Sequence, residues 1–310
     1  MNEIETSDID VKEIIRILWS SKYLISSIVF VFSVLSVLYA LSIPNIYTSS
    51  SILQLSDSDE SSGMSGLANQ YGGLASLAGI SLPSSKGNKS EYIIETVKSR
   101  DFIEHLLEFE GITENLIAAK SYDRATKTIV YDKEIFNTET SEWIREVPSG
   151  RSKIPTNVEV QDTYLKYLSV YQNEMSSFIK INFSHVSPLF AKEFLDLVIS
   201  ELNEVTKIKD LNDSSLALEY LQKELMNTQP IETRQSINKL IETQLQTQTF
   251  ANVRKDYLVS PIETPHIPEI KSSPRRSFIC IIGFLIGTVV SIFFVLVRHY
   301  LFNKDLKISE

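Results

Sequence analysis

Two long apolar runs lie near the two ends of the chain. Residues 24–43 and residues 278–297 contain no charged side chain, and 13 and 15 of their 20 positions are Leu, Ile, Val or Phe. At roughly 1.5 Å of rise per residue, a helix of this length is about 30 Å long, which matches the hydrocarbon core of a bilayer. The pattern therefore predicts two transmembrane helices and excludes a soluble cytoplasmic enzyme.

The first run has an alternative interpretation as a cleaved signal peptide, because Ala40 and Ser42 are small residues at suitable spacing. A signal peptide begins with a basic segment and has a shorter apolar core. Residues 1–23 instead contain five acidic and three basic side chains. We therefore favour a membrane span over a signal peptide.

The charges beside the two runs predict the orientation of the chain. Basic residues are frequent in short cytoplasmic flanks, whereas a long segment is translocated whatever its charge. Both terminal flanks contain such residues, namely Lys12, Arg16, Lys22, Arg298, Lys304 and Lys307. The Arg275–Arg276 pair on the other side of the second run weakens this prediction without reversing it. We expect both termini in the cytoplasm and residues 44–277 on the opposite side of the membrane.

The segment that follows the first run alternates between strand and helix patterns. β-branched and alternating apolar positions predict strands, whereas apolar positions three and four apart predict helices. The predicted elements are a strand at 46–55, a helix pair at 91–109 with Ser99 and Asp101 as caps, a strand at 128–131, a helix at 158–168, and a hairpin of 168–171 and 178–183 around Asn173–Glu174. Residues 44–186 are therefore predicted to form an α+β domain, the mixed α/β base of the molecule.

A glycine-rich stretch interrupts this domain between residues 63 and 79. It contains five of the ten glycines, interleaved with apolar residues. Such a stretch is typical either of a disordered excursion or of a loop that packs against a partner, and the sequence leaves both open.

A long helical segment begins at Ser187, which is a favourable N-cap before Pro188 at the first helical position. Its apolar positions recur with a mean spacing of about 3.5 residues, the coiled-coil period of a helix that buries a narrow seam. The predicted arm and oligomer seam comprises Phe194, Val198, Leu202, Val205, Leu218, Leu221 and Leu225.

Pro230 ends this first helix, and a second helix follows up to Tyr257. The two helices are predicted to form an arm over residues 187–257. Each has only a narrow apolar stripe, so the arm needs either its own hairpin partner or copies from other chains. The alternative is a bent helix wrapped on the α+β core.

Four prolines follow the arm within a short distance. Proline at high density keeps the backbone extended and stiff. Pro261, Pro265, Pro268 and Pro274 therefore predict a strut over residues 258–277 that joins the arm to the second span. The chain then divides into a cytoplasmic segment (1–23), a first span (24–43), the base domain (44–186), the arm (187–257), the strut (258–277), a second span (278–297) and a short cytoplasmic tail (298–310).

The candidate chemistry is sparse. The net charge of −9 argues against nucleic acid, which is bound through clustered Lys and Arg. The four histidines are scattered and the single cysteine, Cys280, lies in the second apolar run, so we expect no metal site, cofactor, disulfide or catalytic centre. Gly283 and Gly287 have the small-xxx-small spacing that lets transmembrane helices approach closely, although this spacing also arises by chance.

Taken in order along the chain, these features resemble the polysaccharide co-polymerases, and among them the Wzz-type regulators of O-antigen chain length. The resemblance lies in residues 9–19, in Gly72 to Ile80, in Ser187–Pro188, in the stretches 220–228, 241–244 and 251–254, and in Ser273 to Arg276 before the second span. It extends over essentially the whole chain, although no single motif is specific.

The resemblance implies a periplasmic α+β base with a protruding helical arm, anchored in the inner membrane of a Gram-negative bacterium. It also implies a non-enzymatic role in lipopolysaccharide biosynthesis: a homo-oligomer, expected as a ring, limits how far a partner O-antigen polymerase extends a polysaccharide on its lipid carrier. Two alternatives stay open, namely a co-polymerase for capsule or exopolysaccharide export and a two-span periplasmic sensor.

Overall fold

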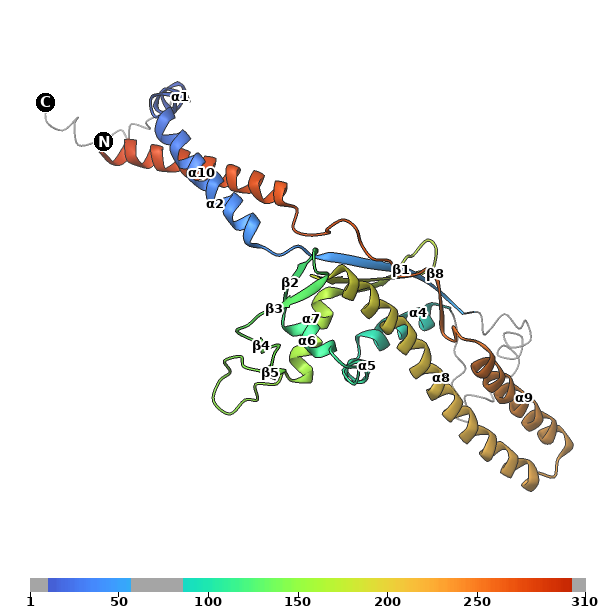
Figure 1. Cartoon of the computed structure of the whole chain (residues 1–310). Helices are drawn as coiled ribbons and strands as arrows, with labels where there is room; N and C mark the ends of the chain where they lie inside the picture. Colours follow the sequence, from blue (N-terminus) through green and yellow to red (C-terminus); the bar gives the residue numbers. More distant parts are fainter. Residues whose placement is uncertain (1–10, 57–85, 303–310) are drawn as a thin grey trace, which may run out of the picture. The chain divides into compact units, whose positions relative to one another are not determined.

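A computed structural model describes residues 11–56 and 86–302 of the chain (Figure 1). The chain divides into two compact units. One consists of residues 1–45 and 272–310, and the other of residues 46–271. The predicted glycine-rich loop at 63–79 lies outside the described residues.

The first unit is built from three helices: α1 (Val11–Ser20), α2 (Lys22–Ser42) and α10 (Arg276–Phe302). Both apolar runs are helical, and Lys22–Ser42 and Arg276–His299 are long and apolar enough to cross a membrane. Helices α2 and α10 pack along each other, and α1 contacts both of them. The short helix α1, which the sequence analysis did not single out, is thus part of the same unit as the candidate spans.

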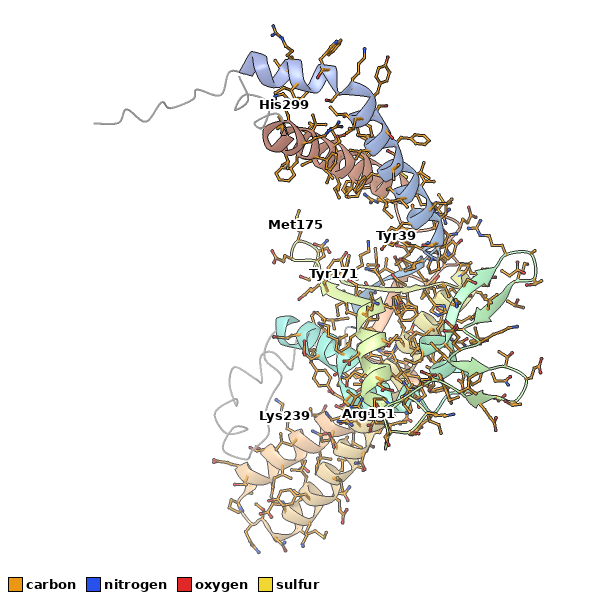
Figure 2. All side chains as sticks on the ribbon, turned by 90° about the vertical axis from the view of Figure 1, so that its left-hand side faces the viewer. Tyr39, Arg151, Tyr171, Met175, Lys239 and His299 are labelled. Atoms are coloured by element: carbon orange, nitrogen blue, oxygen red, sulfur yellow. The ribbon has the colours of Figure 1, made fainter. Side chains whose placement is uncertain are left out.

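The second unit contains a four-stranded antiparallel sheet of β1 (Tyr47–Leu55), β6 (Leu168–Gln172), β7 (Ile179–His185) and β8 (Val259–Glu263). The strand order is β6-β7-β1-β8. The register of β1 on β7 pairs Tyr47 with His185 and Leu53 with Ile179. The predicted first strand and the predicted hairpin are thus confirmed. Met175 lies in the turn of that hairpin and is 98% exposed (Figure 2).

Helices cover one face of this sheet and form the core with it. They are α4 (Lys86–Lys98), α5 (Arg100–Leu106), α6 (Ile112–Ile117), α7 (Asn157–Tyr167) and the first half of α8 (Pro188–Asn227). Burial alternates along β7, so every second side chain of that strand enters the core. Tyr164, Phe183 and Phe194 meet at its centre, with ring centroids of Phe183 and Phe194 4.6 Å apart.

The predicted break between the two helices of the pair is confirmed at Ser99, whereas Asp101 lies in the first turn of α5 and is not its cap. The Phe102 amide donates to the Ser99 hydroxyl at 3.3 Å, which starts α5 after a break from α4. Two short hairpins, β2 (Ala119–Asp123) with β3 (Thr128–Tyr131) and β4 (Phe136–Asn137) with β5 (Glu142–Trp143), complete the domain. Of these four strands the sequence pattern predicted only β3.

The predicted arm is a helical hairpin of α8 and α9 (Ile231–Val253). The Phe190 amide donates to the Ser187 hydroxyl at 3.2 Å, so α8 begins at the predicted cap. Its 40 residues correspond to a length of about 60 Å. In Figure 1 the far half of α8 extends beyond the sheet and lies beside α9.

The segment after the arm differs from the prediction. Helix α9 ends at Val253 rather than at Tyr257, because the chain must become extended to enter β8 at Val259. Pro261 lies within β8 and pairs with Leu53, and a proline fits there because β8 is the edge strand of the sheet. Residues 259–263 are therefore part of the base domain and not of a separate strut.

Candidate functional site: the helical arm and the span pair

The two glycines of the second apolar run lie where α10 packs closely against α2. A Cβ atom at Gly287 would lie 2.7 Å from the Cβ atom of Phe32, and one at Gly283 would overlap the Ser36 side chain. Since real side chains do not tolerate such distances, only glycine allows this separation of the two backbones. The glycine pair thus faces the other apolar helix of the same chain.

Polar contacts reinforce the same interface. The Ser36 hydroxyl donates to the Ile279 carbonyl at 2.9 Å. At the end of α2, Arg276 donates from Nε to the Ala40 carbonyl at 3.1 Å and from Nη2 to the Asn45 side chain at 3.3 Å. A cation suits this position because the last carbonyls of a helix carry partial negative charge.

The predicted seam divides into two parts with different partners. Phe194, Val198 and Leu202 are at most 1% exposed and belong to the core under the sheet. Their burial is complete within one chain. The predicted boundary between base and arm at residue 187 therefore falls inside the packed domain, because the first turns of α8 supply one wall of its core.

Further along α8, the seam faces α9. Leu218 and Leu221 are buried at 8% and 7% exposure, and Val205 and Leu225 are half-buried. The Ser214 hydroxyl donates to the Gln244 carbonyl of α9 at 3.0 Å. The hairpin partner that the narrow stripe requires is thus present in the same chain.

Another set of apolar side chains on the arm faces outward. Ile208, Leu216 and Tyr220 of α8 are 58%, 58% and 66% exposed, and on α9 Leu245 and Val253 are 50% and 77% exposed. The three α8 residues are spaced by eight and four positions, so they lie along one side of the helix. We call these three residues the outer stripe. The spacing of these three residues is visible in the sequence, but it overlaps with the 3.5-residue pattern of the buried seam on the same helix.

The arm is fastened at its root by one buried asparagine that the sequence analysis did not identify. Asn203 is 6% exposed, and its Nδ2 donates to the Ile199 and Val259 carbonyls at 3.2 and 3.0 Å. Its Oδ1 accepts from the amides of Leu258 and Val259 at 2.8 and 2.9 Å. One side chain thus joins α8 to the start of β8, where the chain returns from the arm.

A second contact at the root comes from Tyr257. Its hydroxyl donates to the Asp210 carboxylate at 2.7 Å, and the ring is 8% exposed. The sequence predicted Tyr257 on the second helix, but in the structure it lies after α9 and holds the returning chain against α8.

For Asn203, the signal available in the sequence was a polar residue on an otherwise apolar helix face.

After β8, Pro265 and Pro268 belong to the second unit, whereas Pro274 belongs to the first unit. Pro265, Pro268 and Pro274 are all buried. The Ser49 hydroxyl of β1 donates to the His266 carbonyl at 2.9 Å, so this segment is bound beside β1. Arg124 of the β2–β3 turn reaches it from the other side and donates to the Glu269 carbonyl at 3.4 Å.

His185 is a buried titratable group at the end of β7. It is 4% exposed, its Nδ1 accepts from the Ser187 amide at 3.1 Å, and its Nε2 lies 2.8 Å from the Asn115 carbonyl. Burial lowers the pKa of His185 to about 4. The imidazole is therefore neutral near pH 7 and forms part of the turn into α8.

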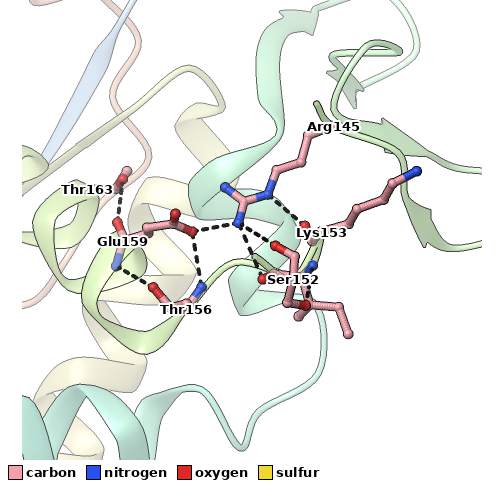
Figure 3. Close-up of polar contacts among 7 residues, drawn as sticks. Arg145, Ser152, Lys153, Thr156, Glu159 and Thr163 are labelled. Carbon is pink, nitrogen blue, oxygen red and sulfur yellow. Dashed lines mark hydrogen bonds and ion pairs between the residues drawn. The ribbon is translucent and has the colours of Figure 1, made fainter. Parts of the chain in front are cut away.

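A polar network at the start of α7 is shown in Figure 3. Arg145 donates to the Glu159 carboxylate at 2.7 Å and to the Lys153 carbonyl at 2.6 Å, while Glu159 and Thr156 form a capping box. The hydrogen bond from Arg145 holds the pKa of Glu159 below its ordinary value. These groups satisfy one another, so the network fixes the loop before α7.

Among residues 11–56 and 86–302, no group of three His, Cys, Asp or Glu side chains is placed to hold a metal ion. Two features of the described residues are taken further as candidates: the outer stripe of the arm and the packed pair of apolar helices.

A protein-family model matches the N-terminal third of the chain. Residues 7–108 match the family model described as "Chain length determinant protein", Wzz. This stretch includes α1, the first candidate span, β1 and the helix pair α4–α5. The match agrees with the resemblance to the chain length determinant proteins over this part of the chain.

Two solved structures align with most of the chain. A full-length bacterial polysaccharide co-polymerase is 15% identical, with 96% of this chain and 98% of that chain covered and a TM-score of 0.42. A fragment of WzzB, a polysaccharide co-polymerase from Salmonella Typhimurium, is 14% identical, with 74% and 100% covered and a TM-score of 0.30. Both superpositions are loose, so they add nothing to the family match. A search of curated proteins found no similar sequence.

Proposed function

We propose that this protein is a non-enzymatic regulator of polysaccharide chain length in the inner membrane of a bacterium. The observation that carries the proposal is the match of residues 7–108 to the chain length determinant family. Two candidate spans and a helical arm are consistent with it. In this proposal both termini are cytoplasmic and residues 46–271 form a periplasmic unit.

The proposed working form is a homo-oligomer, with a ring as the expected arrangement. The outer stripe supports this proposal, because Ile208, Leu216 and Tyr220 expose apolar surface on an arm whose own seam is already closed. Covering apolar surface of this kind with a second copy of the chain lowers the free energy of the system. The outer stripe is therefore proposed as the contact between neighbouring arms.

The proposed partners are an O-antigen polymerase and the growing polysaccharide on its lipid carrier. The oligomer would hold polymer and polymerase together for a limited number of additions, and it would transform nothing itself. Its subunits would set the chain length through the size and surface of the assembly. Export of capsule or exopolysaccharide is the alternative use of the same assembly.

The experiment compares a deletion strain with strains that carry variants of the full-length gene. The polysaccharide ladder on a gel reports chain length, and the mass of the detergent-extracted particle reports subunit number. We expect the deletion to broaden the ladder of O-antigen. An unchanged ladder for every surface polysaccharide would contradict the proposal, and a change confined to capsule or exopolysaccharide would favour the alternative.

The outer stripe is tested by Leu216→Glu, with Gln222→Glu as the matched control on an exposed position of the same helix that lies about 120° around it from Leu216. We expect the first variant to lower the particle mass and to broaden the ladder, because a charge at a packed contact lacks a partner. The control should leave both readouts unchanged. Equal particle masses for the two variants would refute the outer stripe as the oligomer contact.

A further inference from the structure

A groove of about 430 Å³ lies between the three helices of the first unit. Ile15, Leu18 and Trp19 of α1 form one wall, Ile25 and Val29 of α2 form the second, and Phe284 and Thr288 of α10 form the third. This volume falls within the range of about 300 to 1,000 Å³ that is typical of small-molecule sites. The lining is almost entirely apolar, so the groove suits hydrocarbon.

Helix α1 has the character of a helix that lies in the membrane interface. Ile15 and Trp19 on its apolar side are 59% and 73% exposed, and the charged residue Arg16 is also exposed. A short helix with one apolar and one charged face, and with Trp at its edge, typically lies in the plane of the head groups. The groove would then open at the boundary between head groups and acyl chains.

A single cation lines the groove at the junction of α1 and α2. The Lys22 ammonium lies 5.7 Å from the centroid of the Trp19 ring and 5.3 Å from that of Tyr23. Two aromatic rings thus hold the ammonium at the edge of an apolar groove. An apolar groove with a cation at its rim complements a molecule with a hydrocarbon tail and a phosphate head.

We propose that this groove binds one acyl chain of an anionic phospholipid, with the head-group phosphate at Lys22. The inference rests on the membrane location proposed above. Two of the groove's three walls are the candidate spans, so a bilayer supplies phospholipid to it from the side. The positive rim then selects an anionic over a zwitterionic head group.

The test uses Trp19 as the reporter, because the chain has only two tryptophans. Trp143 packs against Phe136 with ring centroids 5.0 Å apart, so Trp143→Phe removes the other signal at little cost in packing. The full-length Trp143→Phe protein is placed in phosphatidylcholine vesicles that contain equal mole fractions of brominated phosphatidylglycerol or brominated phosphatidylcholine. Bromine quenches tryptophan fluorescence on contact, so the two titrations compare the lipids beside Trp19.

We expect phosphatidylglycerol to be preferred about five-fold, the value for one basic residue at the membrane surface. Lys22→Gln should abolish the preference. Arg298→Gln should retain it, because Arg298 lines a neighbouring cavity and not this groove. Equal quenching by both lipids in the Trp143→Phe protein, or an unchanged preference in Lys22→Gln, would overturn the proposal.

A second pair of variants tests whether an acyl chain occupies the groove, separately from the role of the Lys22 charge. Thr288→Phe places a ring in the groove, whereas Val289→Phe places the same ring at a neighbouring position that is 67% exposed. We expect the first variant alone to reduce quenching of Trp19. A brominated polyprenyl phosphate that displaces phosphatidylglycerol would also overturn the proposal in favour of a lipid carrier. Recovery of the protein without detergent, and no quenching at all, would refute the membrane location instead.

Discussion

The buried side chain of Asn203 allows the clearest test of how the arm is fastened to the base domain. In Asn203→Leu, the amides of Leu258 and Val259 lose the oxygen that accepts their hydrogen bonds. Val259 is fully buried, so water does not replace that acceptor. An unsatisfied buried donor costs about 1 to 3 kcal/mol. The Val259 amide has this full cost and the half-buried Leu258 amide a part of it, so we expect the free energy of unfolding to fall by about 3 kcal/mol.

The measurement is thermal unfolding of the detergent-solubilised protein, followed by circular dichroism. For a unit of this size, 1 kcal/mol corresponds to about 2 to 4 °C, so we expect the Tm of Asn203→Leu to fall by about 6 to 12 °C. The control is Asn252→Leu, because Asn252 is exposed on α9 and its Nδ2 donates only to the Gln248 carbonyl of the same helix. Equal Tm values for the two variants would refute the assigned role of Asn203.

Two further predictions concern pH and the span pair. Because burial lowers the pKa of His185 to about 4, the unfolded chain binds a proton between pH 6.5 and 4 that the folded chain rejects. The free energy of unfolding should therefore fall by about 2 to 3 kcal/mol between pH 7 and pH 4.5. Urea titrations should show a smaller fall for His185→Gln. Parallel curves of stability against pH for the unaltered chain and the variant would contradict this. Gly287→Leu should destabilise the packing of α2 and α10 by about 1 to 3 kcal/mol, because its Cβ would meet Phe32, whereas the exposed-site control Val289→Leu should have no effect. Thermal aggregation in detergent measures both span variants, and an unaffected Gly287→Leu would show that the two helices are not in close contact.

The elements that the sequence predicted correctly are those with a strong local signal. Ser187 and Pro188 define the start of α8 by capping chemistry alone, and Ser99 does the same for α5. The hairpin of β6 and β7 follows from alternation on both sides of a polar turn. In each case the residues that determine the element are adjacent in the chain.

The elements that the sequence missed depend on distant partners. β8 is a strand because it pairs with β1, some 200 positions earlier, and its proline argued locally against a strand. The strands β4 and β5 have two residues each, too few to show a period. Their existence depends on packing such as that of Trp143 on Phe136.

The candidate site shows the same division. The 3.5-residue period correctly indicated a buried seam, but a period does not say what covers it. Leu202 is covered by the sheet, whereas Leu218 is covered by α9. The roles of the outer stripe and of Asn203 become apparent only when the residues of α8 that pack under the sheet are distinguished from those that pack against α9.

The pairing of β1 with β8 has a mechanical consequence. β1 begins shortly after α2, and the chain that leaves β8 is bound beside β1 through Ser49 before it reaches α10. The start of β1 and the segment that leaves β8 are therefore joined within the second unit by the hydrogen bonds of one strand pair and of Ser49. Pulling these two ends of the unit apart would first require rupture of those hydrogen bonds, so the strand pair limits how far the ends can separate.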